Sequence, residues 1–155
     1  MNATNRHSKG FSMVVNLLAL ATFVTVLATL VLPWRNDTVR ARVSQGITQA
    51  SLAGEALTAA CRGDHRKVVS DNSDAGYFFI ESKYVADIRL TADCSSGILG
   101  IHVRTQNTGA RPDPEIVLFS RTADPDQGHP QWRCGLASGK AEQVPEECRH
   151  PVTVG

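Results

Sequence analysis

The chain has 155 residues, of which 42% are hydrophobic, 20% charged and 6% aromatic, and its formal net charge is +1. This length suits one modest domain rather than two good cores. The near balance of 16 basic and 15 acidic residues excludes a strongly basic nucleic-acid-binding arm and a strongly acidic tail, and the aromatic residues are too few for a base-stacking surface.

The most apolar segment lies near the N-terminus. Residues 11–32 read FSMVVNLLALATFVTVLATLVL and carry no charge. As a helix they span roughly 33 Å, about one hydrocarbon core. A cleaved secretory signal would have a shorter apolar region and a small-residue cleavage site, and the sequence shows neither. We therefore expect a membrane-spanning helix, with the basic leader (Arg6, Lys9) in the cytoplasm and residues 34–155 outside it.

Two polar features interrupt this apolar segment. Thr22, Thr25 and Thr29 recur at helical spacing and predict a small, weakly polar face, along which helices can approach closely in lipid. Asn16 places an amide where hydrocarbon would surround it, and such a group needs a partner.

The helical pattern continues beyond Pro33. Apolar residues at steps of three, four or seven predict one stripe on a helix: Val39, Val43, Ile47, Ala50, Leu57 and Cys61. Gly46 and Gly54 weaken this helix, and Gly63 supplies its stop. We therefore expect one helix over about residues 11–62, apolar all round in its first half (residues 11–33) and amphipathic in its second (residues 34–63).

The remainder, residues 64–155, is predicted to be a β-rich head. Residues 64–75 are polar and predict a loop. The period then changes to two, with Tyr84, Ala86, Ile88 and Leu90 facing one way and Val85 as the exception, and with Leu99, Ile101 and Val103 alternating in the next strand. Residues 116–119 form a continuous apolar run that suits a strand covered on both sides. The sequence thus predicts an α+β fold, in which an antiparallel sheet of about four strands covers the helix stripe.

Four cysteines allow three disulfide pairings. Cys61 lies on the helix stripe and Cys94 ends a strand that should pack against it, whereas Cys134 and Cys148 enclose a short loop. We favour Cys61–Cys94 and Cys134–Cys148, each stabilising the fold by about 2–4 kcal/mol. A zinc site is the alternative, but no CxxC pair is present.

The N-terminal segment resembles that of type IV pilins. The junction at residues 9–13 (KGFSM), followed by the uncharged run to Pro33, is similar to their leader and N-terminal helix. In that family a prepilin peptidase cuts after the glycine and methylates the new N-terminal residue. The resemblance therefore implies a leader at residues 1–10, cleavage between Gly10 and Phe11, and N-methylation of Phe11.

The C-terminal segment resembles the same family. Residues 131–134 (QWRC) and 144–149 (VPEECR) are similar to the Trp-x-Cys strand and the disulfide-closed loop of type IVa pilins, and residues 83–88 (KYVADI) look like their first head strand. The likeness covers nearly the whole chain and implies the pilin fold.

One departure from the family singles out candidate assembly positions. The family usually has a Glu four residues after the mature Phe, where it is thought to neutralise the N-terminal amine of a neighbouring subunit. Here that position is Val15, and Asn16 takes the place when the spacing is counted back from Pro33. Val15, Asn16 and Pro33 are therefore the candidate assembly positions, and a minor or divergent pilin fits the sequence.

The resemblance implies a structural role. The subunit would wait in the bacterial inner membrane with its head in the periplasm, and would then enter an extracellular pilus that serves adhesion or motility. Its partners would be other pilin subunits, prepilin peptidase and, before assembly, the inner membrane. The alternative is a membrane-anchored periplasmic binding or assembly protein that does not polymerise.

We expect no enzymatic activity, cofactor or metal. The sequence contains no HExxH, GxSxG or P-loop motif, and its histidines lie in different segments: His7, His65, His102, His129 and His150. Asp64 with His65 predicts a solvated turn, and the paired acids at residues 146–147 predict an exposed loop. Residues 64–155 contain 10 basic and 13 acidic residues, so we do not expect nucleic acid as a partner, although Arg104, Arg111 and Arg121 could form a local basic patch.

Overall fold

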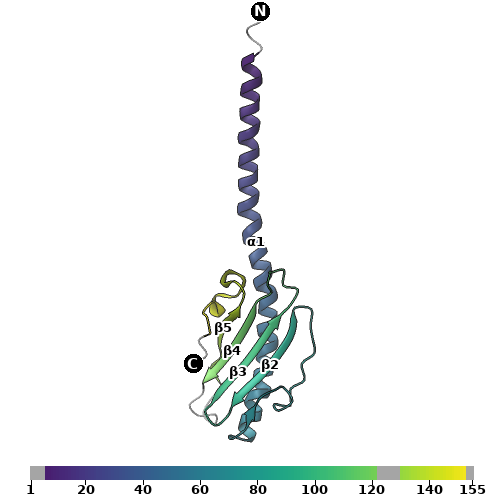
Figure 1. Ribbon diagram of the computed structural model, residues 1–155, viewed down its shortest axis with the longest axis vertical. Helices are drawn as coiled ribbons and strands as arrows, with labels where there is room; N and C mark the ends of the chain where they lie inside the picture. The colour runs from purple at the N-terminus through teal and green to yellow at the C-terminus, as the bar shows by residue number, and fades with distance from the viewer. Residues whose placement is uncertain (1–5, 122–129, 153–155) are drawn as a thin grey trace, which may run out of the picture. The chain divides into compact units, whose positions relative to one another are not determined.

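The chain forms one long helix, α1 (Arg6–Gly63), followed by a five-stranded antiparallel sheet (Figure 1). The structure is a computed structural model that describes residues 6–121 and 130–152, and the side chains at 6–13 and 31–33 of α1 fall outside this description. The chain divides into two compact units, residues 1–36 and residues 37–155, each of which is described by itself.

The sheet follows the chain in simple order, each strand pairing antiparallel with the next. Its strands are β1 (Val68–Val69), β2 (Val85–Asp93), β3 (Ile98–Thr105), β4 (Glu115–Arg121) and β5 (Arg133–Ser138). The α+β layout is therefore as predicted, but the sheet has five strands rather than about four. The extra strand, β1, lies in the segment predicted to be a loop and pairs with the last two residues of β2.

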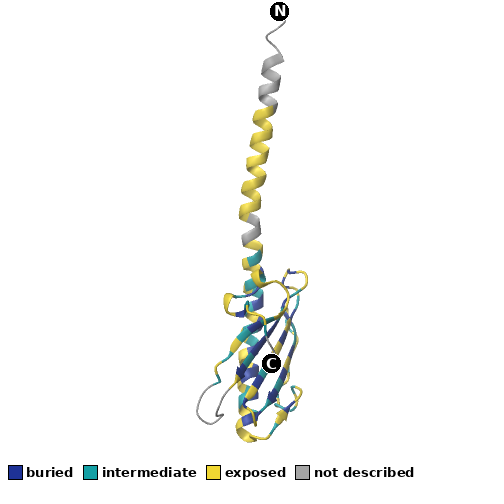
Figure 2. Ribbon diagram, turned by 60° about the vertical axis from the view of Figure 1, so that its left-hand side comes forward, coloured by how far each residue is buried: buried dark blue, intermediate teal, exposed yellow. Residues whose placement is uncertain are grey.

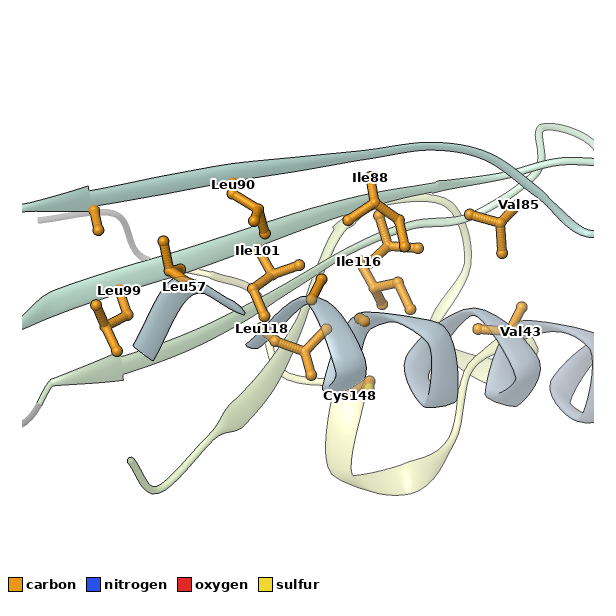
Figure 3. Close-up of a cluster of buried hydrophobic side chains, with 14 of the residues drawn as sticks. Val43, Leu57, Val85, Ile88, Leu90, Leu99, Ile101, Ile116, Leu118 and Cys148 are labelled. Atoms are coloured by element: carbon orange, nitrogen blue, oxygen red, sulfur yellow. The ribbon is translucent and has the colours of Figure 1, made fainter. Parts of the chain in front are cut away.

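The core of residues 37–155 lies between α1 and one face of the sheet (Figure 3). The predicted helix stripe is buried, with Val43 and Leu57 fully inaccessible to solvent and Ile47 half-buried. Ile88, Leu90 and Ile101 meet it from the sheet and are also fully buried. Because the helix is apolar on this side only, the sheet supplies the cover that the amphipathic pattern requires.

The two helix glycines have a packing role that the sequence pattern did not reveal. A Cβ atom on Gly54 would stand 3.0 Å from Cζ2 of Trp132 and 3.3 Å from Cδ1 of Ile101. A Cβ atom on Gly46 would stand 3.4 Å from methyl groups of Val85 and Val103. The glycines thus let the helix approach the sheet closely, which offsets their weak helix propensity of about 1 kcal/mol each.

Replacing Gly54 with leucine is expected to destabilise the head by about 1–3 kcal/mol, because the new side chain must displace Trp132 and Ile101. Gly63→Ala provides the control, since a Cβ atom there meets nothing within 4 Å. Guanidinium unfolding of both variants measures the difference. Equal stability of the two would contradict the close-approach role of Gly54.

The strand alternation holds in β3 and fails at the start of β2. Leu99, Ile101 and Val103 are buried as predicted. In β2, however, Val85 is fully buried while Ala86 is only half-buried, which reverses the predicted orientation. The reason is a bulge: the register with β3 shifts between Val85 and Asp87, so one residue of β2 has no opposite partner.

Two disulfides cross-link the head. Cys61 near the end of α1 is bonded to Cys94 after β2, with 33 residues of separation. Cys134 in β5 is bonded to Cys148, with 14 residues of separation. These are the pairings favoured from the sequence. All three of Cys61, Cys94 and Cys148 are buried, so both bridges belong to the core.

Groups from outside the strands form hydrogen bonds with the outer edges of β2 and β5. The side-chain amide of Asn72 donates to the Ile88 carbonyl at 2.6 Å and accepts from the Leu90 N–H at 2.8 Å. At β5, the N–H of Leu136 donates to the His150 carbonyl at 3.0 Å, and Leu136 forms a parallel bridge with Pro151. Short stretches of chain therefore lie against β2 and β5.

Candidate assembly segment

The first half of α1 has no cover in the described part of the chain. From residue 14 to residue 30 every side chain is exposed (Figure 2), including Leu18 at 62%, Phe23 at 63% and Leu30 at 67%. The helix is long and apolar enough to cross a membrane, with a mean hydropathy of 2.4 in its most apolar window. A face this apolar is stable only in lipid or against other apolar surfaces.

The threonine face needs no partner from outside the helix. The hydroxyl of Thr22 donates to the Ala19 carbonyl at 2.9 Å, and that of Thr25 donates to the Thr22 carbonyl at 2.8 Å. Thr29 donates to the Val26 carbonyl at 3.0 Å. Because each hydroxyl is satisfied within its own helix, this face can lie in hydrocarbon as readily as against another helix.

The candidate assembly positions lie on this helix, but not all are described in full. Val15 is 47% exposed and Asn16 is also exposed. No hydrogen bond of the Asn16 amide is found among the described residues. The backbone of α1 is helical at Gly10 and Phe11 and continues through Pro33. The side chains of Phe11 and Pro33 lie outside the described set, as do residues 1–5 of the predicted leader.

The C-terminal disulfide loop is held against the second half of α1. It contains two short 3₁₀ helices, η1 (Ala141–Gln143) and η2 (Glu146–Cys148). Nε of Arg40 donates to the Glu142 carbonyl at 2.9 Å, and Val144 is fully buried. The loop is therefore an integral part of the head and not a free appendage.

Within the described residues, the histidines and the paired acids at 146–147 lie in different segments of the chain. Among the described residues, no group of three His, Cys, Asp or Glu side chains could hold a metal ion. His102 lies on β3, and the acids of residues 146–147 are exposed in η2, as predicted. The side chains of His7 and His129 lie outside the described residues.

The predicted basic patch is not one patch. Arg104 pairs in register with Glu115 at the start of β4, and Arg121 is the last residue of that strand. Six residues of strand at about 3.4 Å each separate the two ends by roughly 20 Å. Arg111 lies in the loop between β3 and β4. The three arginines therefore do not present a single surface to a phosphate backbone.

Two aspartates, the exposed Asp71 and the half-buried Asp93, are anchored by the turns they begin. Hydrogen bonds to the carboxylate, led by that of the Ser73 hydroxyl at 2.6 Å, hold the pKa of Asp71 below its ordinary value. The Ser95 hydroxyl does the same for Asp93 at 2.6 Å, and Ser96 adds to it, so the pKa of Asp93 is also lowered. Each carboxylate thus stays ionised to lower pH than a free one and orders the turn that follows it.

No protein-family model matches the chain.

Proposed function

We propose that this chain is a structural subunit of a type IV pilus or a related filament, anchored in the bacterial inner membrane before assembly. The observation that carries the proposal is the exposed apolar segment of residues 14–30, which belongs to the same helix as the buried stripe of the head. The junction at Gly10 and Phe11 and the Cys134–Cys148 loop support it through their resemblance to type IV pilins.

The mechanism follows from the two surroundings that suit such a helix. In the membrane, lipid covers the apolar side chains and the internally bonded threonines need no partner. In a filament, the same side chains pack against the helices of other subunits and the heads form the outer surface. Contacts of this head-to-tail type do not close into a ring, so they generate a fibre.

Removal of the leader is a requirement of this mechanism. Arg6 and Lys9 precede the apolar segment, and a charged side chain in an apolar core is costly. The first test is therefore the N-terminal mass of the protein from cells with and without prepilin peptidase. A mature chain that begins at Phe11 and carries one added methyl group is expected only when the peptidase is present.

The same experiment separates the proposal from its alternative, a membrane-anchored periplasmic protein that does not polymerise. Filaments sheared from cells should contain the processed chain. An intact leader in cells that have the peptidase, or a processed chain that never enters the sheared fraction, would favour the alternative and overturn the filament proposal.

Introducing a carboxylate by Asn16→Glu is expected to increase the fraction of the chain found in sheared filaments severalfold, measured by quantitative immunoblotting. The physical reason is that a buried N-terminal ammonium without a counter-charge is costly, and an amide supplies no charge. Val15→Glu tests the neighbouring position.

The control for this prediction is Leu20→Glu, which places the same charge in the same apolar segment at a site 60% exposed in the structure. This variant should lower incorporation, because its carboxylate lies away from the amine. If all three carboxylates lower incorporation alike, charge neutralisation near the mature N-terminus does not limit assembly.

A further inference from the structure

A groove lies on the outer face of the sheet, the face turned away from α1. Two adjoining hollows of about 320 and 860 Å³ share Thr91, His102 and Val117 in their walls and form one continuous groove across β2, β3 and β4. Neither the filament proposal nor the disulfide core uses this face. Sites for small ligands typically have volumes of this size.

The floor of the groove is hollow because a glycine stands at its centre. Gly100 of β3 is opposite Thr91 on one side and Phe119 on the other. A Cβ atom at Gly100 would stand 2.8 Å from the Thr91 hydroxyl oxygen, so no larger residue fits without displacing that side chain. The missing side chain leaves room beside Phe119, which is half-buried, and Val117, which is buried.

Charge is balanced at one end of the groove. Asp87, Arg104 and Glu115 are opposite one another across β2, β3 and β4. Arg89 also lines this end, which therefore has two acids and two arginines. Cross-strand neighbours of opposite charge attract each other. This end of the groove therefore has no excess of positive charge to offer a ligand.

Among the described residues, the lining of the other end has such an excess. Arg133 is opposite Phe119 on β5, and Arg121 lies two residues further along β4, which makes the two arginines diagonal neighbours on one face. Within the described part of the chain, neither guanidinium has an ion pair or a hydrogen bond. Asp93, the acid in the described lining of this end, is bonded to the Ser95 hydroxyl at 2.6 Å and to the Ser95 N–H at 3.1 Å.

We infer that this groove binds a small organic carboxylate with an apolar ring, its carboxylate held by Arg121 and Arg133 and its ring lying over Gly100 against Phe119 and Val117. Arginine binds carboxylate through paired N–H groups, and two arginines at one end of the groove suit one such anion. The apolar lining, which also includes Ile98 and Val152, accounts for the ring.

Two other occupants fit the groove less well. An extended peptide would need free backbone groups, but the N–H and C=O groups of β3 are used in the ladders to β2 and β4. A nucleic acid or other long polyanion would pass over Asp87 and Glu115, in a head whose residues 64–155 contain three more acids than bases. A compact monoanion avoids both difficulties.

The test is ¹⁹F NMR titration of 4-fluorobenzoate with the full-length chain in a neutral detergent. We expect saturable binding that Arg121→Gln and Arg133→Gln each weaken at least tenfold, while Arg104→Gln at the balanced end changes it less than twofold. The neutral analogue 4-fluorobenzamide should bind at least tenfold more weakly than the acid. Unfolding midpoints of the three variants, followed by Trp132 fluorescence, check that their folds are intact.

Several outcomes would overturn the inference. The first is probe binding that Arg121→Gln and Arg133→Gln both leave unchanged, and the second is equal binding of the amide. The others are displacement of the probe by inorganic phosphate at the same concentration as by benzoate, and tighter binding of a DNA oligonucleotide than of the carboxylate. Absence of saturable binding would overturn it as well. None of these results bears on leader processing or on the sheared filaments, so the two proposals stand or fall separately.

Discussion

Replacing Leu57 with alanine is expected to lower the free energy of unfolding of the head by about 2–5 kcal/mol. Leu57 is fully buried between α1 and the sheet, so truncation removes apolar contacts and leaves a cavity (Figure 3). Guanidinium unfolding of the full-length chain in detergent, followed by the fluorescence of the core-packed Trp132, measures the loss.

Leu52→Ala is the matched control for this prediction. Leu52 belongs to the same helix and carries the same side chain, but it is 64% exposed. Its replacement should change the free energy of unfolding by no more than about 0.5 kcal/mol. Similar losses in the two variants would mean that the second half of α1 does not bury the side that the structure assigns to the core.

Removing the Cys61–Cys94 bridge by a double substitution to alanine is expected to cost about 4 kcal/mol. The bridge closes a loop of 33 residues, and the loss of this constraint raises the entropy of the unfolded chain. Removing Cys134–Cys148, which closes 14 residues, should cost about 3 kcal/mol. Equilibrium unfolding in denaturant measures both losses against the unsubstituted chain. Each variant keeps the other bridge, so each measurement reports the loss of one bridge alone.

The order of the two losses is the discriminating result. If only the entropy of loop closure mattered, removing the bridge of the longer loop, Cys61–Cys94, would cause the larger loss in free energy of unfolding. If the Cys134–Cys148 variant loses more, the C-terminal loop contributes native packing, through Val144 and the Arg40 contact, that exceeds the difference in loop length.

The helix and its buried side could be predicted from the sequence because both depend on local periodicity. Steps of three and four residues place Val39, Val43 and Leu57 on one side whatever covers them, and all three are buried. The two glycines on that side could not be interpreted in the same way. Their role depends on how near Trp132 and Ile101 come to Gly54, and Val85 and Val103 to Gly46, which only the packed structure determines.

Pairing between strands accounts for what the sequence pattern missed in the head. β1 has only two residues, and its strand conformation depends on β2 lying beside it, with the N–H of Cys94 donating to the Lys67 carbonyl at 3.0 Å. The bulge after Val85 likewise arises from the register with β3. Neither feature produces a periodic pattern of apolar residues in the sequence. The two valines at 68–69 and the nearby Cys61–Cys94 bridge are nevertheless compatible with β1.

Of the two candidate sites, the assembly segment could be predicted from the sequence and the groove could not. Gly10, Phe11, Val15 and Asn16 follow from a contiguous motif. All four lie on α1, which begins at Arg6 and so includes Gly10, whereas the sequence predicted a helix from about residue 11. The groove could not be identified so, because Arg121 and Arg133 become neighbours only through the register of β4 with β5. The sequence instead suggested grouping Arg121 with Arg104, which the strand separates.

The hydrogen bonds of the Asn72 amide protect one edge of the sheet from aggregation. The unpaired N–H and C=O groups of an outer strand are a template for a strand from another molecule, and this is a common route to aggregation. At Ile88 and Leu90 that template is occupied by Asn72, and at Leu136 by the chain around His150 and Pro151. At these points the head is thus protected from joining its sheet to a strand of another molecule.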